Sequence, residues 1–223
     1  MTPKGAAIWD VDGTLVDTAE QHFRAWVELA KSIDKPFSRA DFAATFGRRN
    51  PEIIRALFDS HADDRTVADL GDRKEQIYRA AAQREGIALL PGVRQLLDGI
   101  KALGWPQAVG SSAPRANLEL ILAVTRTTAD FAVVVAAEDT TRGKPDPQVF
   151  QVAAAKVGVP PERCVVFEDA VAGVAAAKAA GMKCVAVRFV GHHPAEALRA
   201  AGADRVVECL TEITAADVRR LIE

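Results

Sequence analysis

The sequence contains few cysteines and no long apolar run. Its three cysteines, Cys164, Cys184 and Cys209, are odd in number, and no two have the spacing of metal ligands. This pattern argues against a disulfide framework and favours reduced thiols in a cytoplasmic protein. No stretch approaches the roughly 18 consecutive apolar residues of a membrane span. The apolar run Ala6–Trp9 near the N-terminus is too short for a signal peptide.

An excess of charge of one sign is also missing. The 28 Lys and Arg residues nearly balance the 30 Asp and Glu residues, which gives a formal net charge of −2. The chain therefore has no global basic field that would attract nucleic acid or an anionic membrane, and we expect a monomer with neither partner. Apolar residues make up 49% of the 223 positions, which suits one large α/β domain or a core with a smaller companion.

Six short apolar runs recur along the chain and lack the alternation of a half-exposed strand. Such runs favour a parallel sheet that is buried on both faces. They are Ala6–Trp9, Gln107–Val109, Val133–Val135, Val165–Phe167, Val185–Val187 and Arg205–Val207. Helical patterns lie between most of them, at Val93–Leu103, Pro114–Val124, Asp146–Gly158, Val171–Ala180 and Pro194–Ala201. The alternation predicts an α/β fold with a doubly wound, Rossmann-like parallel sheet.

One region interrupts this alternation, because no strand pattern occurs between about Thr18 and Leu89. Helical stretches are predicted there at Ala19–Ser32, Arg39–Phe46, Pro51–His61 and Asp72–Gly86. An all-helical block that follows the first strand indicates a second domain inserted into the first. We therefore predict a Rossmann-like core formed by residues 1–17 and 89–223 and an α-helical cap domain formed by residues 18–88.

Polar side chains follow four of the predicted strands, beyond the point where each strand ends. They are Asp10 and Asp12, Ser111 and Ser112, Lys144, and Glu168 and Asp169. In an open parallel sheet, ligands bind beyond the carboxyl ends of the strands. We therefore expect these side chains to converge at one edge of the sheet.

The chemical types of these residues fit phosphoryl transfer. Carboxylates at Asp10 and Asp169, helped by Glu168, are hard oxygen ligands that suit Mg²⁺. A phosphoryl group in transfer spreads negative charge over three oxygens, and the cation, Lys144 and the Ser111 hydroxyl can each serve one of them. The three carboxylates would nearly balance a divalent cation and an ammonium group, as a buried site requires.

The two aspartates of the first cluster suit different roles. Asp10 can attack phosphorus to give an aspartyl-phosphate. Asp12 can protonate the leaving oxygen and later deprotonate water. Alone, the pair would fit a turn with capping aspartates, but the three other clusters favour a catalytic pair. Ser112 has the alternative role of capping the helix that begins near Pro114.

Four segments together resemble the haloacid dehalogenase superfamily, in the branch of β-phosphoglucomutase and sugar-phosphate phosphatases. The segments are DVDGTLVDT, SSAPR, GKPDP and VVFEDAVAGVAAAKAAGM. The resemblance covers nearly the whole chain and implies that Asp10 is the nucleophile and Asp12 the acid/base, whose backbone carbonyl also binds the metal. It implies phosphate binding by Ser111 and Lys144 and Mg²⁺ binding by Asp169, with Glu168 in support. Family members often have serine where this chain has Ala170.

The start of the predicted cap domain also resembles β-phosphoglucomutase and several hexose-phosphate phosphatases. The resemblance implies that Thr18, His22, Arg49 (or Asn50) and Lys74 face the substrate. An arginine there suits a second phosphate because of its forked donors. Each residue has a plain alternative: His22 as a surface histidine, and Arg49 and Lys74 as solvated charges.

Four functions compete on this pattern. The leading hypothesis is a Mg²⁺-dependent phosphatase of small phosphorylated sugars. The alternative is β-phosphoglucomutase, in which a second sugar hydroxyl captures the phosphoryl group. A haloacid dehalogenase would use Asp10 but need neither Asp12 nor a metal. A non-catalytic binding module would be expected to lack Asp10 or Lys144, and both are present.

Overall fold

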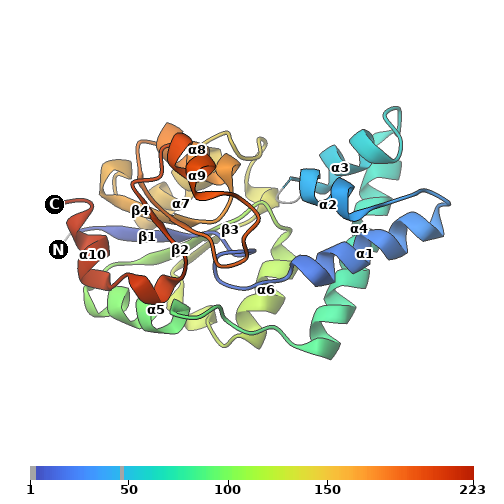
Figure 1. Cartoon of the computed structure of the whole chain (residues 1–223). Coiled ribbons are helices and arrows are strands. Elements are labelled where there is room, and N and C mark those ends of the chain that lie inside the picture. Colours follow the sequence, from blue (N-terminus) through green and yellow to red (C-terminus); the bar gives the residue numbers. More distant parts are fainter. Residues whose placement is uncertain (1–3, 46–47) are drawn as a thin grey trace. The chain divides into compact units, whose positions relative to one another are not determined.

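The structure is a computed structural model that describes residues 4–45 and 48–223. The chain divides into two units, each coloured by sequence in Figure 1. The core unit comprises Met1–Asp17 and Ala88–Glu223, and the helical unit comprises Thr18–Ile87. Within the described residues, no helix combines the length and the apolar character that a bilayer crossing requires.

A six-stranded parallel sheet forms the centre of the core unit, with strand order β3-β2-β1-β4-β5-β6. The strands are β1 (Ala6–Trp9), β2 (Gln107–Gly110), β3 (Val133–Val135), β4 (Cys164–Glu168), β5 (Lys183–Val187) and β6 (Arg205–Val207). The first, second and fourth strands are buried along their whole length. The predicted doubly wound α/β fold is therefore confirmed.

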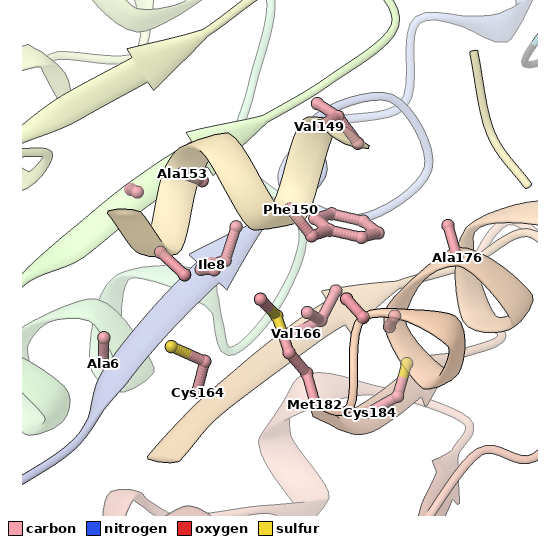
Figure 2. Close-up of a cluster of buried hydrophobic side chains, with 14 of the residues drawn as sticks. Ala6, Ile8, Val149, Phe150, Ala153, Cys164, Val166, Ala176, Met182 and Cys184 are labelled. Carbon is pink, nitrogen blue, oxygen red and sulfur yellow. The ribbon is translucent and has the colours of Figure 1, made fainter. Parts of the chain in front are cut away.

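Helices cover both faces of this sheet, as Figure 1 shows, with α7, α8 and α9 on one side and α5, α6 and α10 on the other. Their bounds are α5 (Val93–Ala102), α6 (Arg115–Val124), α7 (Gln148–Val157), α8 (Val171–Ala179), α9 (Ala195–Ala200) and α10 (Ala215–Arg220). Phe150 of α7 projects into a buried cluster that also holds Ile8 of β1 and Val166 of β4 (Figure 2). Cys164 and Cys184 are buried free thiols in the same cluster, and burial raises the pKa of each.

A tryptophan precedes the predicted nucleophile, and its polar group is satisfied inside the core. Trp9 stacks on Phe167 of the neighbouring strand with ring centroids 4.0 Å apart. Its Nε1–H donates to Oε1 of buried Gln107 at 3.1 Å, and Nε2 of Gln107 donates to the carbonyl of Leu97 at 3.0 Å. Because buried polar groups require partners, Gln107 allows this large ring to lie in a central strand.

The helical unit has its own aromatic core. Its elements are α1 (Ala19–Ser32), α2 (Arg39–Thr45), α3 (Asn50–Leu57) and α4 (Asp64–Glu85). Trp26 packs on Phe37 and Phe58 with centroids 5.9 and 5.8 Å apart, and Phe23 meets Phe42 edge-on at 5.6 Å. These rings lie in or against one buried apolar cluster to which all four helices contribute.

Two predicted helices differ from the observed ones by four residues or more at one end. Helix α4 starts at Asp64, well before the predicted start at Asp72, because the side chain of Asp63 accepts the N–H of Thr66 at 2.7 Å and caps the helix. Helix α3 ends at Leu57 instead of His61. The predicted end of another helix, Phe46, lies outside the described residues.

Helix α10 was not predicted at all. It begins with a capping box in which Thr214 Oγ1 accepts the N–H of Asp217 at 3.2 Å, and Asp217 Oδ2 accepts the N–H of Thr214 at 2.9 Å. The spacing of these two residues is a known sequence signal for a helix start.

Candidate active site

A tight turn directly after β1 carries Asp10 and Asp12. The N–H of Gly13 donates to the carbonyl of Val16 at 2.8 Å, which closes the turn. Gly13 has φ +83°, and a side chain there would place its Cβ 2.0 Å from Oδ2 of Asp169. Glycine is therefore needed at position 13 both for the backbone conformation and for the close approach of the Asp169 carboxylate.

The end of β4 brings two more carboxylates beside this turn. The backbone N–H of Asp10 donates to the carbonyl of Phe167 at 3.0 Å, which fixes the two strand ends next to each other. Oε2 of Glu168 accepts the N–H groups of Asp169 and Ala170, both at 2.8 Å. Strands β1 and β4 meet where the order of the sheet reverses, which is the usual ligand position in such folds.

Lys144 connects the two carboxylate clusters. Its Nζ donates to Oδ1 of Asp10 at 2.5 Å and to Oε1 of Glu168 at 2.7 Å. The same ammonium lies 4.8 Å from the ring centroid of Phe150, which anchors it above the core. The Lys144 side chain is 6% exposed, so both ion pairs are shielded from water.

The loop that carries Lys144 is held by side-chain contacts to the start of α7. Oε1 of Gln148 accepts the N–H groups of Thr141 and Arg142, both at 3.0 Å. Oδ1 of Asp146 accepts the N–H of Gln148 at 3.0 Å. These contacts give the loop a defined path, so the ammonium is positioned before any ligand arrives.

Burial dominates the electrostatics of the site. It raises the pKa of Asp10 to about 7, with Lys144 opposing the rise and Glu168 and Asp12 adding to it. Burial, followed by repulsion from Glu168 and Asp10, raises the pKa of Asp169 well above its ordinary value. Burial alone would lower the pKa of Lys144, but Asp10 and Glu168 outweigh it and raise the pKa. At Asp10 burial outweighs the attraction of Lys144, and at Asp169 repulsion from Glu168 and Asp10 adds to the effect of burial.

This donor set fits a hard divalent cation. Asp10, Glu168 and Asp169 each offer a carboxylate oxygen, and these oxygens lie within 4.8 Å of one another. All three residues are buried, and oxygen ligands with surplus negative charge are what Mg²⁺ binds. The side chain of Asp12 is not in this group; its predicted contribution to the metal was its backbone carbonyl.

The remaining predicted core residues lie on the same edge. Ser111 is buried at the end of β2, where its N–H donates to the carbonyl of Val135 at 3.1 Å and its Oγ accepts the N–H of Ala113 at 3.1 Å. Ser112 is half-buried on the same loop. Pro114 is the N-cap residue of α6, without a side-chain cap bond, so the alternative of Ser112 as the cap is wrong.

The helical unit holds a buried polar cluster of its own. Nζ of Lys74 lies 2.7 Å from Nδ1 of His22 and donates to Oε1 of Glu75 at 2.8 Å. Nδ2 of Asn50 donates to the same Glu75 oxygen at 2.7 Å. The His22 ring stacks on Tyr78 with centroids 3.8 Å apart. Lys74 and Asn50 therefore converge on one oxygen of Glu75, and His22 joins this network through Nδ1.

The surface alternatives for His22 and Lys74 are therefore wrong. His22 is 8% exposed and Lys74 is 2% exposed, and Nζ of Lys74 also lies 5.2 Å from the ring centroid of Trp26. Thr18 is buried at the N-cap of α1, and its carbonyl accepts the N–H of His22 at 3.0 Å. Arg49 is half-buried and precedes α3.

Sequence reasoning missed Glu75, the buried carboxylate beside Lys74. A signal for the burial of Lys74 was present, because Val67, Leu70, Lys74 and Tyr78 recur at the spacing of one helix face. The predicted start of this helix at Asp72 cut that face in half. The apolar stripe that includes Lys74 was therefore not visible in the prediction.

Comparison with known families decides what this site belongs to. The sequence model of the haloacid dehalogenase-like hydrolases matches residues 5–181. The chain is a haloacid dehalogenase-like hydrolase. The family predicted from the four motifs is confirmed, and the matched residues contain every predicted site residue of both units.

Curated relatives of this haloacid dehalogenase-like hydrolase include both phosphatases and a mutase. The chain is 32% identical to validoxylamine A 7′-phosphate phosphatase of Streptomyces hygroscopicus subsp. limoneus, over 93% of this chain and 94% of that protein. It is 33% identical to the β-phosphoglucomutase of Bacillus subtilis (strain 168), over 94% of this chain and 91% of that protein.

Solved structures share the fold. The crystal structure of CbbY from Rhodobacter sphaeroides in complex with phosphate superimposes with a TM-score of 0.82. That protein is 28% identical to this hydrolase, and the match covers 95% of this chain and 96% of the other.

The replacement of the family's usual serine by Ala170 leaves the observed contacts of this hydrolase intact. Ala170 is the N-cap residue of α8 and has extended backbone geometry. It contacts Glu168 through its backbone N–H, which any residue except proline supplies. The loss of the hydroxyl therefore does not disturb the orientation of Glu168.

We expect Mg²⁺ to raise the melting temperature of this hydrolase, and to raise it more at about pH 8 than at about pH 5, because metal ligands must be deprotonated. The pKa of Asp10 is raised to about 7, so a proton competes with the cation below that pH. At a concentration about 100 times Kd, binding adds about 2.7 kcal/mol of stability. Circular dichroism melts with MgCl₂ or EDTA, matched in ionic strength with NaCl, measure the shift. An equal shift at both pH values contradicts the expectation.

Proposed function

We propose that the chain is a Mg²⁺-dependent phosphatase that hydrolyses small phosphorylated sugars or related metabolites through an aspartyl-phosphate on Asp10. One observation carries the proposal. Four buried charged side chains (Asp10, Lys144, Glu168 and Asp169) meet at the carboxyl edge of a parallel sheet, although they come from three separate segments. Such a cluster lowers the stability of the ligand-free protein, and proteins keep such clusters mainly at functional sites.

In the first half of the proposed reaction, the Asp10 carboxylate attacks phosphorus. A bond forms between Oδ of Asp10 and phosphorus as the bond from phosphorus to the ester oxygen breaks. Asp12 donates a proton to that oxygen, so the sugar leaves as a neutral alcohol. Lys144, which contacts Asp10 at 2.5 Å, supplies positive charge next to the attacked group.

In the second half, water attacks the aspartyl-phosphate. Asp12, now deprotonated, takes a proton from the water, and the bond between Asp10 and phosphorus breaks to release inorganic phosphate. Asp12 is half-buried whereas Asp10 is buried, which suits a group that exchanges protons beside one that forms a covalent bond. Mg²⁺, held by Asp10 and Asp169 with Glu168 in support, would neutralise charge on the phosphoryl oxygens.

The roles of Ser111 and Ser112 as phosphate binders, and of Thr18, His22, Arg49 and Lys74 as substrate-facing residues, stay predictions from the resemblance. Nδ1 of His22 lies 2.7 Å from Nζ of Lys74, so these two residues are held next to each other within the helical unit.

The test is release of inorganic phosphate from a panel of hexose and pentose phosphates, measured with Mg²⁺ and with EDTA. We expect release that depends on Mg²⁺ and is lost in Asp12→Ala. Phosphate release from β-glucose 1-phosphate without formation of glucose 6-phosphate excludes the mutase. Formation of glucose 6-phosphate in place of phosphate release overturns the proposal in favour of the mutase. Phosphate release that survives EDTA and Asp12→Ala contradicts the proposed mechanism, whereas halide release from a haloacid without any phosphate release assigns a dehalogenase.

A further inference from the structure

A glycine in α8 lies where the carboxylate of Glu168 is packed. A side chain at Gly173 would place its Cβ 1.7 Å from Oε1 and 2.6 Å from Oε2 of Glu168, and real Cβ atoms do not come within 3.0 Å of other heavy atoms. Gly173 is not among the glycines with positive φ. In a helix interior glycine is about 1 kcal/mol less favourable than alanine. Backbone conformation therefore does not explain this glycine, whereas space for the carboxylate does.

The carboxylate that fills this space is fixed on both oxygens. Oε2 accepts the N–H groups of Asp169 and Ala170 at the start of α8. Oε1, the atom that a Cβ would approach most closely, accepts Nζ of Lys144 at 2.7 Å. Glu168 is 1% exposed, so it has little room to find another position that keeps all three bonds.

We propose that Gly173 is a positioning residue, which sets the place of the Glu168 carboxylate and, through it, the place of Lys144 and of the metal-binding group. The proposal rests on the function proposed above. A side chain at Gly173 pushes the carboxylate toward the cation site or away from Lys144. Because the carboxylate ends a flexible side chain, it can rotate away while the backbone stays in place.

The test compares Gly173→Ala with a matched helical glycine. We expect the affinity for Mn²⁺, measured by calorimetry with the metal alone, and kcat/KM for phosphate release to fall by about 10- to 100-fold. The melting temperature should change little, because alanine favours the helix. Gly71→Ala is the control: it lies inside α4, where a Cβ would meet its nearest neighbour at 3.6 Å, and we expect both quantities to stay unchanged.

A second background separates displacement of the carboxylate from general damage. Glu168→Asp shortens the side chain, so the carboxylate no longer reaches the space beside Gly173. We expect Gly173→Ala to lower Mn²⁺ affinity in the wild-type background but by less than about twofold in the Glu168→Asp background, because residues in contact are coupled. Equal losses in both backgrounds, or unchanged Mn²⁺ affinity in Gly173→Ala, would overturn the proposal.

The metal readout also keeps this inference separate from the proposed function. If the wild-type protein hydrolyses no phosphate ester but binds Mn²⁺, the proposed function fails. The coupling between Gly173 and Glu168 is still read from Mn²⁺ affinity in that case, and it supports or overturns the positioning role by itself.

Discussion

Asp10→Asn is expected to abolish phosphate release while leaving the protein folded. The amide has nearly the shape of the carboxylate but is not nucleophilic, so no aspartyl-phosphate forms. Removal of a nucleophile that acts with its partners lowers kcat by on the order of 10⁴-fold or more. Steady-state phosphate release and trapping of the phosphorylated protein by acid quench measure the two consequences.

The fold should survive because two effects on stability oppose each other. The substitution removes the ion pair between Asp10 and Lys144, but Lys144 keeps its contact with Glu168. It also removes a carboxylate whose charged form is unfavourable in the folded protein, since burial raises its pKa to about 7. We expect the melting temperature to change by only a few degrees, which corresponds to a change on the order of 1 kcal/mol in the free energy of unfolding.

The matched control for this change is Asp98→Asn. Asp98 lies on α5, its side chain is 61% exposed, and it pairs with Arg94 at 3.5 Å. The same chemical change there should leave kcat unaltered, because Asp98 lies outside the site. The fold should also be little affected, because an exposed ion pair contributes only about 0–1 kcal/mol to the free energy of unfolding. Turnover of Asp10→Asn within about tenfold of the wild type, with deamidation excluded by intact mass, contradicts the role of nucleophile.

Asp169→Asn is expected to remove activity and, at the same time, to stabilise the metal-free protein. Burial and the neighbouring carboxylates of Glu168 and Asp10 raise the pKa of Asp169, so its charged form is unfavourable without a cation. Neutralising it relieves that repulsion. The loss of a metal ligand should lower kcat/KM by about 10³-fold or more, since metal stabilisation of developing charge contributes several kcal/mol.

The pH dependence of this stabilisation has a definite sign. Because its pKa is raised in the folded state, Asp169 binds a proton more tightly there than in the unfolded chain. Its contribution to stability therefore falls as the pH rises from the ordinary pKa of 3.8 through the raised value. The advantage of Asp169→Asn over the wild type should therefore be small near pH 4 and larger at neutral and higher pH. Paired thermal melts in EDTA across this range test the prediction.

Magnesium provides the complementary measurement. It should raise the melting temperature of the wild type but not that of Asp169→Asn, because the variant lacks one of the three clustered carboxylates. A variant that is less stable than the wild type in EDTA at neutral pH would show that the carboxylates are not in repulsion. A full Mg²⁺ response in the variant would remove Asp169 from the metal site.

The outcome of these experiments bears on why the site is built this way. Two carboxylates with raised pKa values and a single lysine are an unfavourable combination without a ligand. Proteins retain such groups where function requires them, at the expense of stability. The prediction that loss of activity accompanies a gain in stability is specific to a functional cluster, because the loss of a structural ion pair would lower both.

Local features of the sequence were sufficient for much of the fold. The apolar runs matched the six strands, and the central strands β1, β2 and β4 need largely apolar residues because they are buried along their whole length. The capping box at Thr214 and the cap at Asp63 were also local signals, but they were overlooked, so α10 and the start of α4 were missed. Helix boundaries depend on such single side-chain bonds, which periodicity does not reveal.

The sequence by itself determined that Asp10, Asp12, Ser111, Lys144, Glu168 and Asp169 follow strands of one parallel sheet, because chain order and strand periodicity place strand ends at one edge. Only the tertiary structure decided which of them touch. Lys144 contacts Asp10 across 134 residues of sequence, Lys74 is buried against His22 and Glu75, and Gly173 leaves space for Glu168. Burial and close packing depend on residues that are distant in the chain, and they set the pKa values that periodicity cannot encode.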